Sequence, residues 1–295
     1  MKIHRLPFLP ITLFFYTTAA AQLPDTDIFL VDLKNENGKI SCGIPENLTR
    51  RPGYDNQPCF SEDGKSLYYV RVEDTTQSDI YSVNLSTKKS ERITNTKESE
   101  YSPFFSPNDK SLTVVRVDRD SGQRAYRLPF NSISSATLIP GTDSIGYFCW
   151  LNDSLLAMFI LGPSNTLQVL NTKTLVRTLI ASDVGRCLKL SPDKQEMLFV
   201  IKGNETEWFI YSLNVESLKT ERMIRTIPGN EDFAILPDKT LLLGSDGKLF
   251  SWKAGLPESW TELADFTSTL HSFYRISVNA KGTRLALVAF TGKKP

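Results

Sequence analysis

The fold is decided by one stretch of sequence, Gln57-Pro58-Cys59-Phe60-Ser61-Glu62-Asp63-Gly64-Lys65-Ser66-Leu67-Tyr68-Tyr69-Val70. It joins an aromatic residue, a cluster of turn-forming residues and a hydrophobic run. Asp and Gly tolerate positive φ, and Asp and Ser side chains hydrogen-bond to nearby backbone, so the cluster at 61–65 is typical of a tight hairpin. The flanking runs are rich in β-branched and aromatic residues and have the length of strands. The stretch therefore predicts a β-hairpin.

The same pattern recurs along the chain at intervals of 40 to 45 residues, which indicates an internal repeat. A second hairpin follows in several copies, as in Asp79-Ile80-Tyr81-Ser82-Val83 before Ser90-Glu91-Arg92-Ile93-Thr94. Each repeat thus holds about four strands, and four strands in about 40 to 45 residues are typical of a β-propeller blade. The six copies align on Ser61, Ser106, Leu151, Ser191, Leu236 and Val278.

The two ends of the chain predict how the ring closes. After the sixth turn only the run at 285–290 remains, which supplies an inner hairpin and no outer one. Near the N-terminus, the segment beginning at Asp27 resembles the one beginning at Asp79. The N-terminal strands would thus complete the last blade and bury edges that an open solenoid leaves exposed. We predict an all-β, six-bladed β-propeller of four-stranded antiparallel blades, forming a single domain at 22–295.

Residues 1–21 are typical of a secretory signal peptide. Lys2 and Arg5 precede an apolar run that ends at Ala19-Ala20-Ala21, before Gln22. The run is too short to span a bilayer, so we expect no transmembrane segment in the mature chain, which would be periplasmic or secreted. The whole chain carries 34 Lys and Arg against 33 Asp and Glu. Such a balance provides no long-range field for phosphates and argues against nucleic-acid binding.

The sequence offers few residues for catalysis or metal binding. Removal of the signal peptide would leave His271 as the only histidine, which argues against catalysis by a histidine base and against a metal site of several imidazoles. The run Gly162-Pro163-Ser164-Asn165 begins a nucleophile elbow but lacks its final glycine. Equivalent turn positions hold acidic residues that point apart and cannot share an ion: Asp63, Asp109, Asp193 and Asp238. We expect no metal and no cofactor.

Four cysteines permit disulfides in an exported protein: Cys42, Cys59, Cys149 and Cys187. Cys149 and Cys187 come from inner strands of adjacent predicted blades, so topology favours this pair. The alternative is that the cysteines are buried free thiols, because Cys packs as a small hydrophobic residue. The sequence leaves both possibilities open.

The stretch at 57–70, followed by Ser78-Asp79-Ile80-Tyr81 and Arg92-Ile93-Thr94, resembles the repeat of the TolB-type periplasmic β-propeller family. The resemblance covers residues 27–290 and implies a role in the cell envelope. TolB proteins carry an additional α/β domain before the propeller. Here the first expected strand begins soon after Gln22, so we expect a propeller alone. The repeat also resembles the propellers of prolyl-oligopeptidase-type peptidases, whose catalysis belongs to a separate hydrolase domain.

In a propeller, the links from each outer strand to the next inner strand lie on one face beside the central channel. We call this the channel face. Loops that converge in this way commonly bind ligands. The alignment places tyrosines and mixed charges there, which suits recognition. The alternative is that the tyrosines fill the mouth of the channel and bind no partner. The predicted partner-binding residues are Asp55, Gln57, Glu100, Tyr101, Tyr147, Arg186, Glu231, Asp232 and Tyr274.

The functional expectation is a monomeric, non-enzymatic exported propeller. It would bind an envelope protein or peptide through its channel face, as a scaffold or accessory factor similar to TolB. The alternative is a propeller hydrolase or lyase that acts on a carbohydrate or peptide with channel-face carboxylates such as Glu100 and Glu231. Paired carboxylates about 5 to 10 Å apart can cleave glycosides without a histidine.

Overall fold

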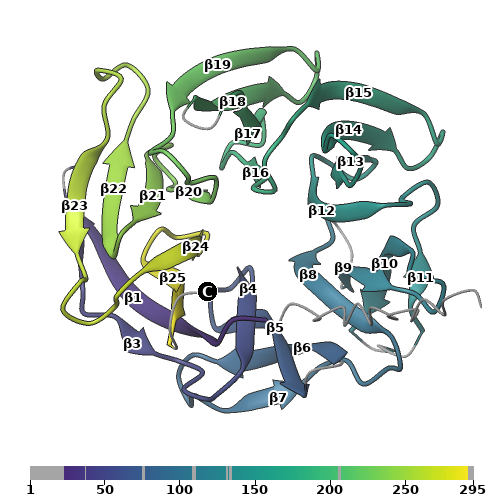
Figure 1. Cartoon of the computed structure of the whole chain (residues 1–295), viewed down its shortest axis with the longest axis horizontal. Coiled ribbons are helices and arrows are strands. Elements are labelled where there is room, and N and C mark those ends of the chain that lie inside the picture. The colour runs from purple at the N-terminus through teal and green to yellow at the C-terminus, as the bar shows by residue number, and fades with distance from the viewer. Residues whose placement is uncertain are drawn as a thin grey trace, which may run out of the picture.

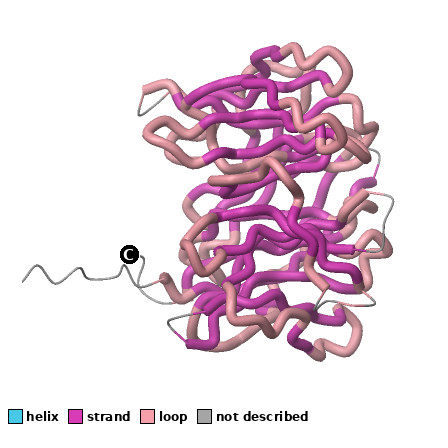
Figure 2. The backbone as a smooth tube through the Cα atoms, turned by 90° about the vertical axis from the view of Figure 1, so that its right-hand side faces the viewer, coloured by secondary structure: helices cyan, strands magenta, loops and turns pink. Residues whose placement is uncertain are grey.

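The chain folds into strands that begin and end at the turn clusters of the repeat. The computed structural model describes residues 23–36, 38–74, 77–107, 111–130, 132, 135–204 and 207–291. The predicted signal peptide at 1–21 lies outside these residues. The described residues form 25 strands joined by loops and contain no helix (Figure 2). This part of the chain accordingly has no helix that could cross a membrane.

Four sheets each contain four strands that follow one another in the chain, paired antiparallel. The first comprises β8 (Ser99–Phe105), β9 (Ser111–Val117), β10 (Gln123–Pro129) and β11 (Thr137–Leu138). The second comprises β12 (Ile145–Trp150), β13 (Leu155–Ile160), β14 (Thr166–Asn171) and β15 (Arg177–Ser182). The third comprises β16 (Lys189–Leu190), β17 (Glu196–Lys202), β18 (Trp208–Asn214) and β19 (Thr220–Arg225). The fourth comprises β20 (Phe233–Ile235), β21 (Leu241–Ser245), β22 (Lys248–Trp252) and β23 (Thr261–Asp265).

The remaining strands form one continuous path in the order β24, β25, β1, β4, β5, β6, β7, with β2 and β3 attached to β1. β1 pairs antiparallel with β25 from Thr26 opposite Phe290 to Asp32 opposite Arg284. β1 meets β4 at a single parallel pair, Thr26 with Tyr54. The N-terminal strand thus lies beside the last strand. The bounds are β1 (Thr26–Glu36), β2 (Lys39–Cys42), β3 (Glu46–Asn47), β4 (Tyr54–Phe60), β5 (Ser66–Asp74), β6 (Gln77–Asn84), β7 (Ser90–Arg92), β24 (Phe273–Val278) and β25 (Arg284–Phe290).

The sheets stand around a central axis in the order of the sequence (Figure 1). Strands β4, β8, β12, β16, β20 and β24 lie nearest the axis, and β7, β15, β19 and β23 lie toward the rim (Figure 1). Radially arranged, four-stranded antiparallel sheets define a β-propeller. The repeats aligned on Leu151 and Leu236, in which the sequence pattern is weakest, also form complete four-stranded sheets.

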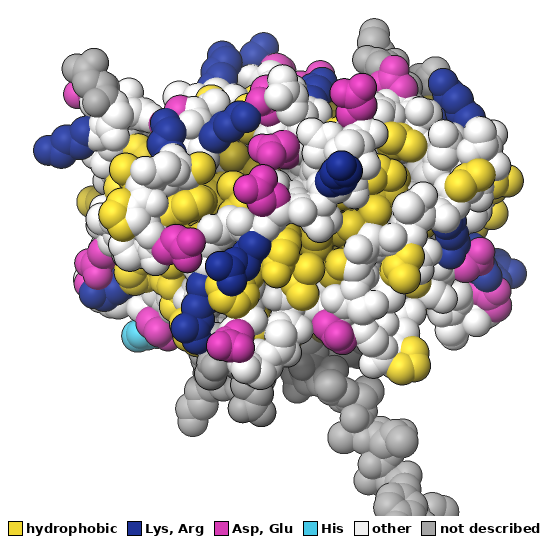
Figure 3. All heavy atoms as spheres, turned by 90° about the horizontal axis from the view of Figure 1, so that it is seen from above, with side chains coloured by type: hydrophobic (Ala, Val, Ile, Leu, Met, Phe, Trp, Pro, Cys, Tyr) yellow, Lys and Arg dark blue, Asp and Glu magenta, His cyan; other side chains and the backbone are white. Residues whose placement is uncertain are grey.

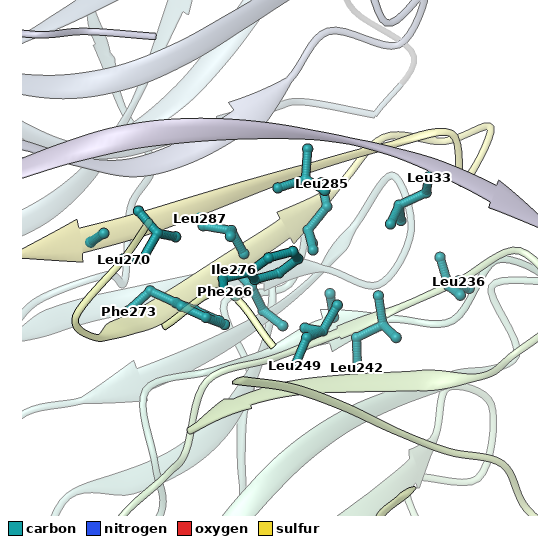
Figure 4. Close-up of a cluster of buried hydrophobic side chains, with 13 residues drawn as sticks. Leu33, Leu236, Leu242, Leu249, Phe266, Leu270, Phe273, Ile276, Leu285 and Leu287 are labelled. Carbon is teal, nitrogen blue, oxygen red and sulfur yellow. The ribbon is translucent and has the colours of Figure 1, made fainter. Parts of the chain in front are cut away.

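The hydrophobic core lies between neighbouring sheets. Between β20–β22 and the sheet of β24, β25 and β1, Leu242 and Leu249 pack with Phe273 and Leu287 (Figure 4). Burial of each such side chain stabilises the fold by about 1.5–3 kcal/mol. Gly244 permits the close approach of these sheets, because a Cβ atom there would lie 2.2 Å from Cε2 of Phe273.

The inner strands begin with irregular pairing. The sequence predicts Asp55, Gln57, Glu100 and Tyr101 in links between strands, but these residues already belong to β4 and β8. The register of β4 against β5 shifts between Asn56 and Cys59, and that of β8 against β9 shifts between Tyr101 and Phe104. Gln57 and Ser102 stand at the two shifts with φ of 55° and 52°. A β-bulge re-aims the side chains that follow it, so strand backbone rather than mobile loop positions this face of the channel.

The side of the rim seen in Figure 3 carries mixed side chains. Basic and acidic groups are intermingled there, with hydrophobic side chains between them. The most exposed large hydrophobic residues around β15 are Leu175, Val176 and Leu179, at 52, 59 and 62 %. No charge of one sign dominates this view, in keeping with the near-equal totals of basic and acidic residues.

Candidate functional site

The nine predicted binding residues fall into three groups. Five lie together where inner strands begin, two lie at the register shifts of β4 and β8, and two are buried away from the surface. The first group is Tyr147, Arg186, Glu231, Asp232 and Tyr274. The second is Gln57 and Tyr101, and the third is Asp55 and Glu100.

Arg186 joins two carboxylates of the loop that leads into β20. Its guanidinium lies 3.0 Å from Oε1 of Glu231 and 2.5 Å from Oδ2 of Asp232. The backbone N–H of Arg186 donates to Oε2 of Glu231 at 2.9 Å. The ammonium of Lys202 lies 3.0 Å from the same Oε2 atom. Charge-assisted hydrogen bonds of this kind fix the side chains of Arg186 and Glu231 in place.

Arg275 in β24 completes the group, although the sequence analysis does not single it out. Its Nη1 donates to Oδ1 of Asn56 at 3.0 Å, and its Nη2 donates to the hydroxyl of Tyr147 at 3.2 Å. Its Nε lies 3.7 Å from Oδ1 of Asp232. The side chain is only 12 % exposed. An arginine between two apolar positions of an inner strand, Phe273 and Ile276, is the sequence signal that could have revealed it.

Tyr274 connects β24 with β4. Its hydroxyl accepts a hydrogen bond from Nδ2 of Asn56 at 2.5 Å, and its ring stacks on Phe290 at a centroid distance of 5.0 Å. The guanidinium of Arg186 lies 5.9 Å from the centre of the Tyr274 ring. We refer to Tyr147, Arg186, Glu231, Asp232, Tyr274 and Arg275 as the channel-face cluster.

The cluster remains charged because its members compensate one another. Burial acts to raise the pKa of Asp232, but the positive charges of Arg186 and Arg275 outweigh it and hold this pKa below the ordinary value. Burial acts to lower the pKa of Arg275, but the nearby tyrosines and Asp232 raise it above its usual range. Asp232 is therefore a carboxylate, and both arginines are cations, at neutral pH.

Asp55 and Glu100 do not reach the surface of the channel face. Both residues are fully buried. Asp55 accepts a hydrogen bond from Nη1 of Arg51 at 3.0 Å, and Glu100 accepts one from Nε of Arg116 at 3.1 Å. Burial raises the pKa of Asp55 to about 6 despite the opposing charge of Arg51, and burial also raises the pKa of Glu100. Both carboxylates thus bond to arginines within the protein interior and do not form part of the channel-face surface.

Gln57 and Tyr101 lie at the β-bulges. The amide Oε1 of Gln57 accepts a hydrogen bond from the backbone N–H of Ser102 at 2.5 Å, which ties β4 to β8. The half-buried Tyr101 packs against two hydrophobic clusters on either side of β8. Gln57 lines a cavity in the channel, whereas the Tyr101 ring mainly supports the packing of β8.

Two cavities follow one another along the channel. The first, the inner cavity, has a volume of about 100 Å³ and is bordered by Gln57, Tyr147, Arg186, Asp232 and Arg275. The second has a volume of about 420 Å³ and lies where the inner strands end in their hairpin turns. We call it the turn-end cavity. Residues that line both are Cys59, Phe104, Lys189 and Ser277. The larger cavity thus lies toward the end of the channel opposite the channel face.

Metal ligands do not converge in the described part of the chain. No group of three or more His, Cys, Asp or Glu residues is placed there to hold a metal ion. All four cysteines are free, including the pair Cys149 and Cys187 that topology favours. Burial raises the pKa of the Cys187 thiol to about 12, so this thiol is not ionised at neutral pH.

Comparison with known proteins reveals similarity in structure only. No protein-family model and no curated protein matches the sequence. A putative TolB from Agrobacterium tumefaciens is similar with a TM-score of 0.68 and 13 % identity, over 92 % of this chain and 99 % of that one. TolB from Acinetobacter baumannii is similar with a TM-score of 0.59 and 14 % identity, over 90 % of this chain. The match spans 64 % of the length of that TolB.

An oligogalacturonate lyase, determined in complex with manganese, is also similar, with a TM-score of 0.57 and 16 % identity. That match covers 83 % of this chain and 80 % of the lyase. At such identities the similarity establishes the fold and leaves the activity open, because one fold carries many functions. The chain therefore has a TolB-like β-propeller fold.

Proposed function

We propose that this chain is an exported, monomeric β-propeller that binds an envelope protein or peptide through its channel face, without catalysis. In this proposal residues 22–295 form one domain that acts in the periplasm or after secretion, as a scaffold or accessory factor. The observation that carries the proposal is the channel-face cluster, in which two arginines and two tyrosines converge beside the channel. Arg and Tyr are enriched among the residues that dominate binding energy at protein interfaces.

The rigidity of the cluster supports a binding role. Arg186 is held by two carboxylates, and Arg275 is held by Asn56 and Tyr147. A partner that contacts these groups would not have to order them, so less conformational entropy is lost on binding. The Arg186 side chain remains 29 % exposed and can reach a partner.

The architecture that we propose has six blades and a closed ring. The continuous path from β24 to β7 would comprise two blades that touch at the single parallel pair of Thr26 and Tyr54. The seven consecutive pairs between β1 and β25 support the assignment of β1 to the last blade. The hydrophobic cluster that includes Ile28, Leu67 and Val288 supports packing between these two blades.

The alternative, a propeller hydrolase or lyase that uses Glu100 and Glu231, has less support. Glu100 is fully buried and bonded to Arg116, and Glu231 is held by Arg186 and Lys202. A glycosidase needs one carboxyl group that donates a proton and a second that faces the substrate. Neither side chain is free to take these roles without breaking its ion pair.

The test of the proposed function is affinity capture from the native envelope extract. The bait is the mature chain, compared with a double variant, Arg186→Met with Tyr274→Phe. The variant leaves Glu231 paired with Lys202 and Asp232 beside Arg275, and it retains the stacking on Phe290. Lys194→Met, at the opposite end of the channel, is the matched control. We expect a partner that the wild type and the control retain and the double variant loses. Equal capture by all three proteins would remove the channel face as the binding site.

A further inference from the structure

The turn-end cavity is a second candidate site, distinct from the channel-face cluster. Its volume of about 420 Å³ falls within the range of about 300–1,000 Å³ that is common for small-molecule pockets. Its walls are formed by the ends of the inner strands and the turns that follow. The apolar part of the wall includes Phe60, Phe105, Trp150, Pro192 and Ile235.

Most of the neutral polar side chains that line the turn-end cavity are already engaged within the protein, whereas the charged Glu62 and Lys194 lie at its exposed rim. The hydroxyl of Ser61 donates to Oδ1 of Asp63 at 2.7 Å, and that of Ser191 donates to Oδ1 of Asp193 at 2.6 Å. The side-chain oxygen of Asn279 accepts from the backbone N–H groups of Thr283 and Arg284. A sugar or a peptide backbone would find few free hydrogen-bonding groups here, whereas an apolar chain needs none.

Lys189 provides the contrasting feature, a cation that forms no ion pair among the described residues. It lines both cavities, and in this part of the chain no carboxylate lies within 4.0 Å of its ammonium group. Asp232, in the wall of the inner cavity, is a carboxylate whose pKa the charge of Lys189 helps to lower. Burial raises the pKa of Cys59 to about 11 and that of Cys149 to about 12, and in both cases the positive charge of Lys189 opposes the rise. The positive charge of Lys189 therefore acts within the channel, beside the two cavities that this residue lines.

The inner cavity around Lys189 has an excess of positive charge. Three cations line it, Arg186, Lys189 and Arg275, against one carboxylate, Asp232. An anionic group that entered from the turn-end cavity would reach Lys189 first, because only Lys189 of these three cations lines both cavities. Lys189 is half-buried, and positive charge that is partly shielded from water favours an anion more strongly than the same charge at an open surface.

We propose that the turn end of the channel binds a small apolar monocarboxylate, whose carboxylate pairs with Lys189 while its hydrocarbon body fills the turn-end cavity. The site lies at the opposite end of the channel from the proposed partner site, and it does not depend on that function. The combination of an apolar wall and one unpaired cation at its inner end favours this chemistry over a neutral apolar ligand or a polar one.

Isothermal titration calorimetry of the mature chain with octanoate, 1-octanol and acetate tests the proposal. We expect octanoate to bind at least about tenfold more tightly than 1-octanol, equivalent to about 1.4 kcal/mol, and acetate to bind more weakly than either. Lys189→Met should remove the preference for octanoate and leave 1-octanol unaffected. The control Lys194→Met should retain it, because Lys194 is exposed at the rim of the same cavity.

A steric variant tests the placement of the hydrocarbon body. Ala280→Trp adds a large side chain at an exposed position of the rim and should weaken octanoate and 1-octanol alike. The thermal unfolding midpoint of each variant checks that the fold is retained. Absence of octanoate binding to the wild type, equal affinity for octanoate and 1-octanol, or unchanged octanoate binding in a folded Lys189→Met variant would each overturn the proposal.

Discussion

The guanidinium of Arg186 donates to the carboxylate of Asp232 at 2.5 Å, and this contact joins the segment before β16 to the start of β20. Arg275 approaches the other oxygen of the same carboxylate at 3.7 Å. One buried carboxylate thus pairs with an arginine that precedes β16 and with an arginine of β24. Because Asp232 is only 7 % exposed, water could not solvate the two guanidinium groups well enough to replace its carboxylate.

Asp232→Asn should destabilise the protein, because it leaves the excess positive charge of Arg186 and Arg275 in a poorly hydrated site. We expect a loss of about 3–5 kcal/mol in the free energy of unfolding, measured with urea. Asp153→Asn, at the exposed turn between β12 and β13, is the control and should change stability by less than about 0.5 kcal/mol. Similar small losses in both variants would show that Asp232 does not hold the cluster together.

Asp232 should also contribute to acid denaturation. The folded protein holds its pKa below the ordinary value, so the stabilisation is present above about pH 4 and is lost as the pH falls through the folded pKa. The wild type should therefore lose stability more steeply than Asp232→Asn on acidification from pH 5. Parallel stability curves for the two proteins would contradict the lowered pKa.

The raised pKa of Asp55 predicts that its contribution to stability depends on pH with the opposite sign. Burial raises its pKa to about 6, above the ordinary value of 3.8, so the folded state favours the protonated form. Its favourable contribution is present below about pH 4 and is lost as the pH rises through about 6.

The effect of Asp55→Asn on the free energy of unfolding should therefore be more favourable at pH 7 than at pH 4. We expect a difference on the order of 1–3 kcal/mol between these two pH values, measured by urea titration. Asn can still accept the hydrogen bond from Arg51, which makes it the suitable replacement. An equal effect of the substitution at both pH values would contradict the raised pKa.

Gly244→Ala should strain the contact between the β20–β23 sheet and β24. The added Cβ would lie 2.2 Å from the Phe273 ring, so the ring must move within a filled core. We expect a loss of about 1–3 kcal/mol in thermal or urea unfolding. Adding Phe273→Leu should recover part of this loss because the smaller side chain leaves room for the methyl group. Full additivity of the two substitutions would argue against a direct clash.

Deletion of residues 23–49 tests the proposed closure of the ring. It removes β1, β2 and β3 and exposes the edge of β25, which should lead to aggregation in light scattering. Val31→Asp, which places a single buried charge in β1, should also promote aggregation in light scattering. A deletion variant that stays monomeric with the thermal stability of the full chain would refute the closure.

The sequence predicts the β-propeller architecture well because each repeat carries its own turn residues and strand pattern. The weak repeats aligned on Leu151 and Leu236 fold in the same way, since hydrophobic alternation and a turn suffice once neighbouring sheets pack against them. The pairing of Asp27 to Asp32 with the last strand follows from the resemblance between the segments that begin at Asp27 and Asp79.

The candidate site is harder to predict from the sequence, because strand irregularities decide where its side chains point. The register shifts in β4 and β8 break the simple alternation of faces, so a position in the repeat does not reveal that Asp55 and Glu100 are buried. Arg275 lies in a strand that reads as hydrophobic, and its partners Asn56 and Tyr147 are distant in the sequence. The cluster arises from contacts between repeats, which no single repeat encodes.

The measurement that tests the central claim most directly is site-specific photo-cross-linking in the native envelope. A photoreactive phenylalanine analogue replaces Pro228, which is exposed in the loop that carries Glu231 and Asp232, or, as the control, Leu179 on the rim. We predict a discrete adduct with one envelope protein or peptide from position 228 and none from position 179. An adduct from position 179 alone, or no adduct from position 228, would contradict binding through the channel face.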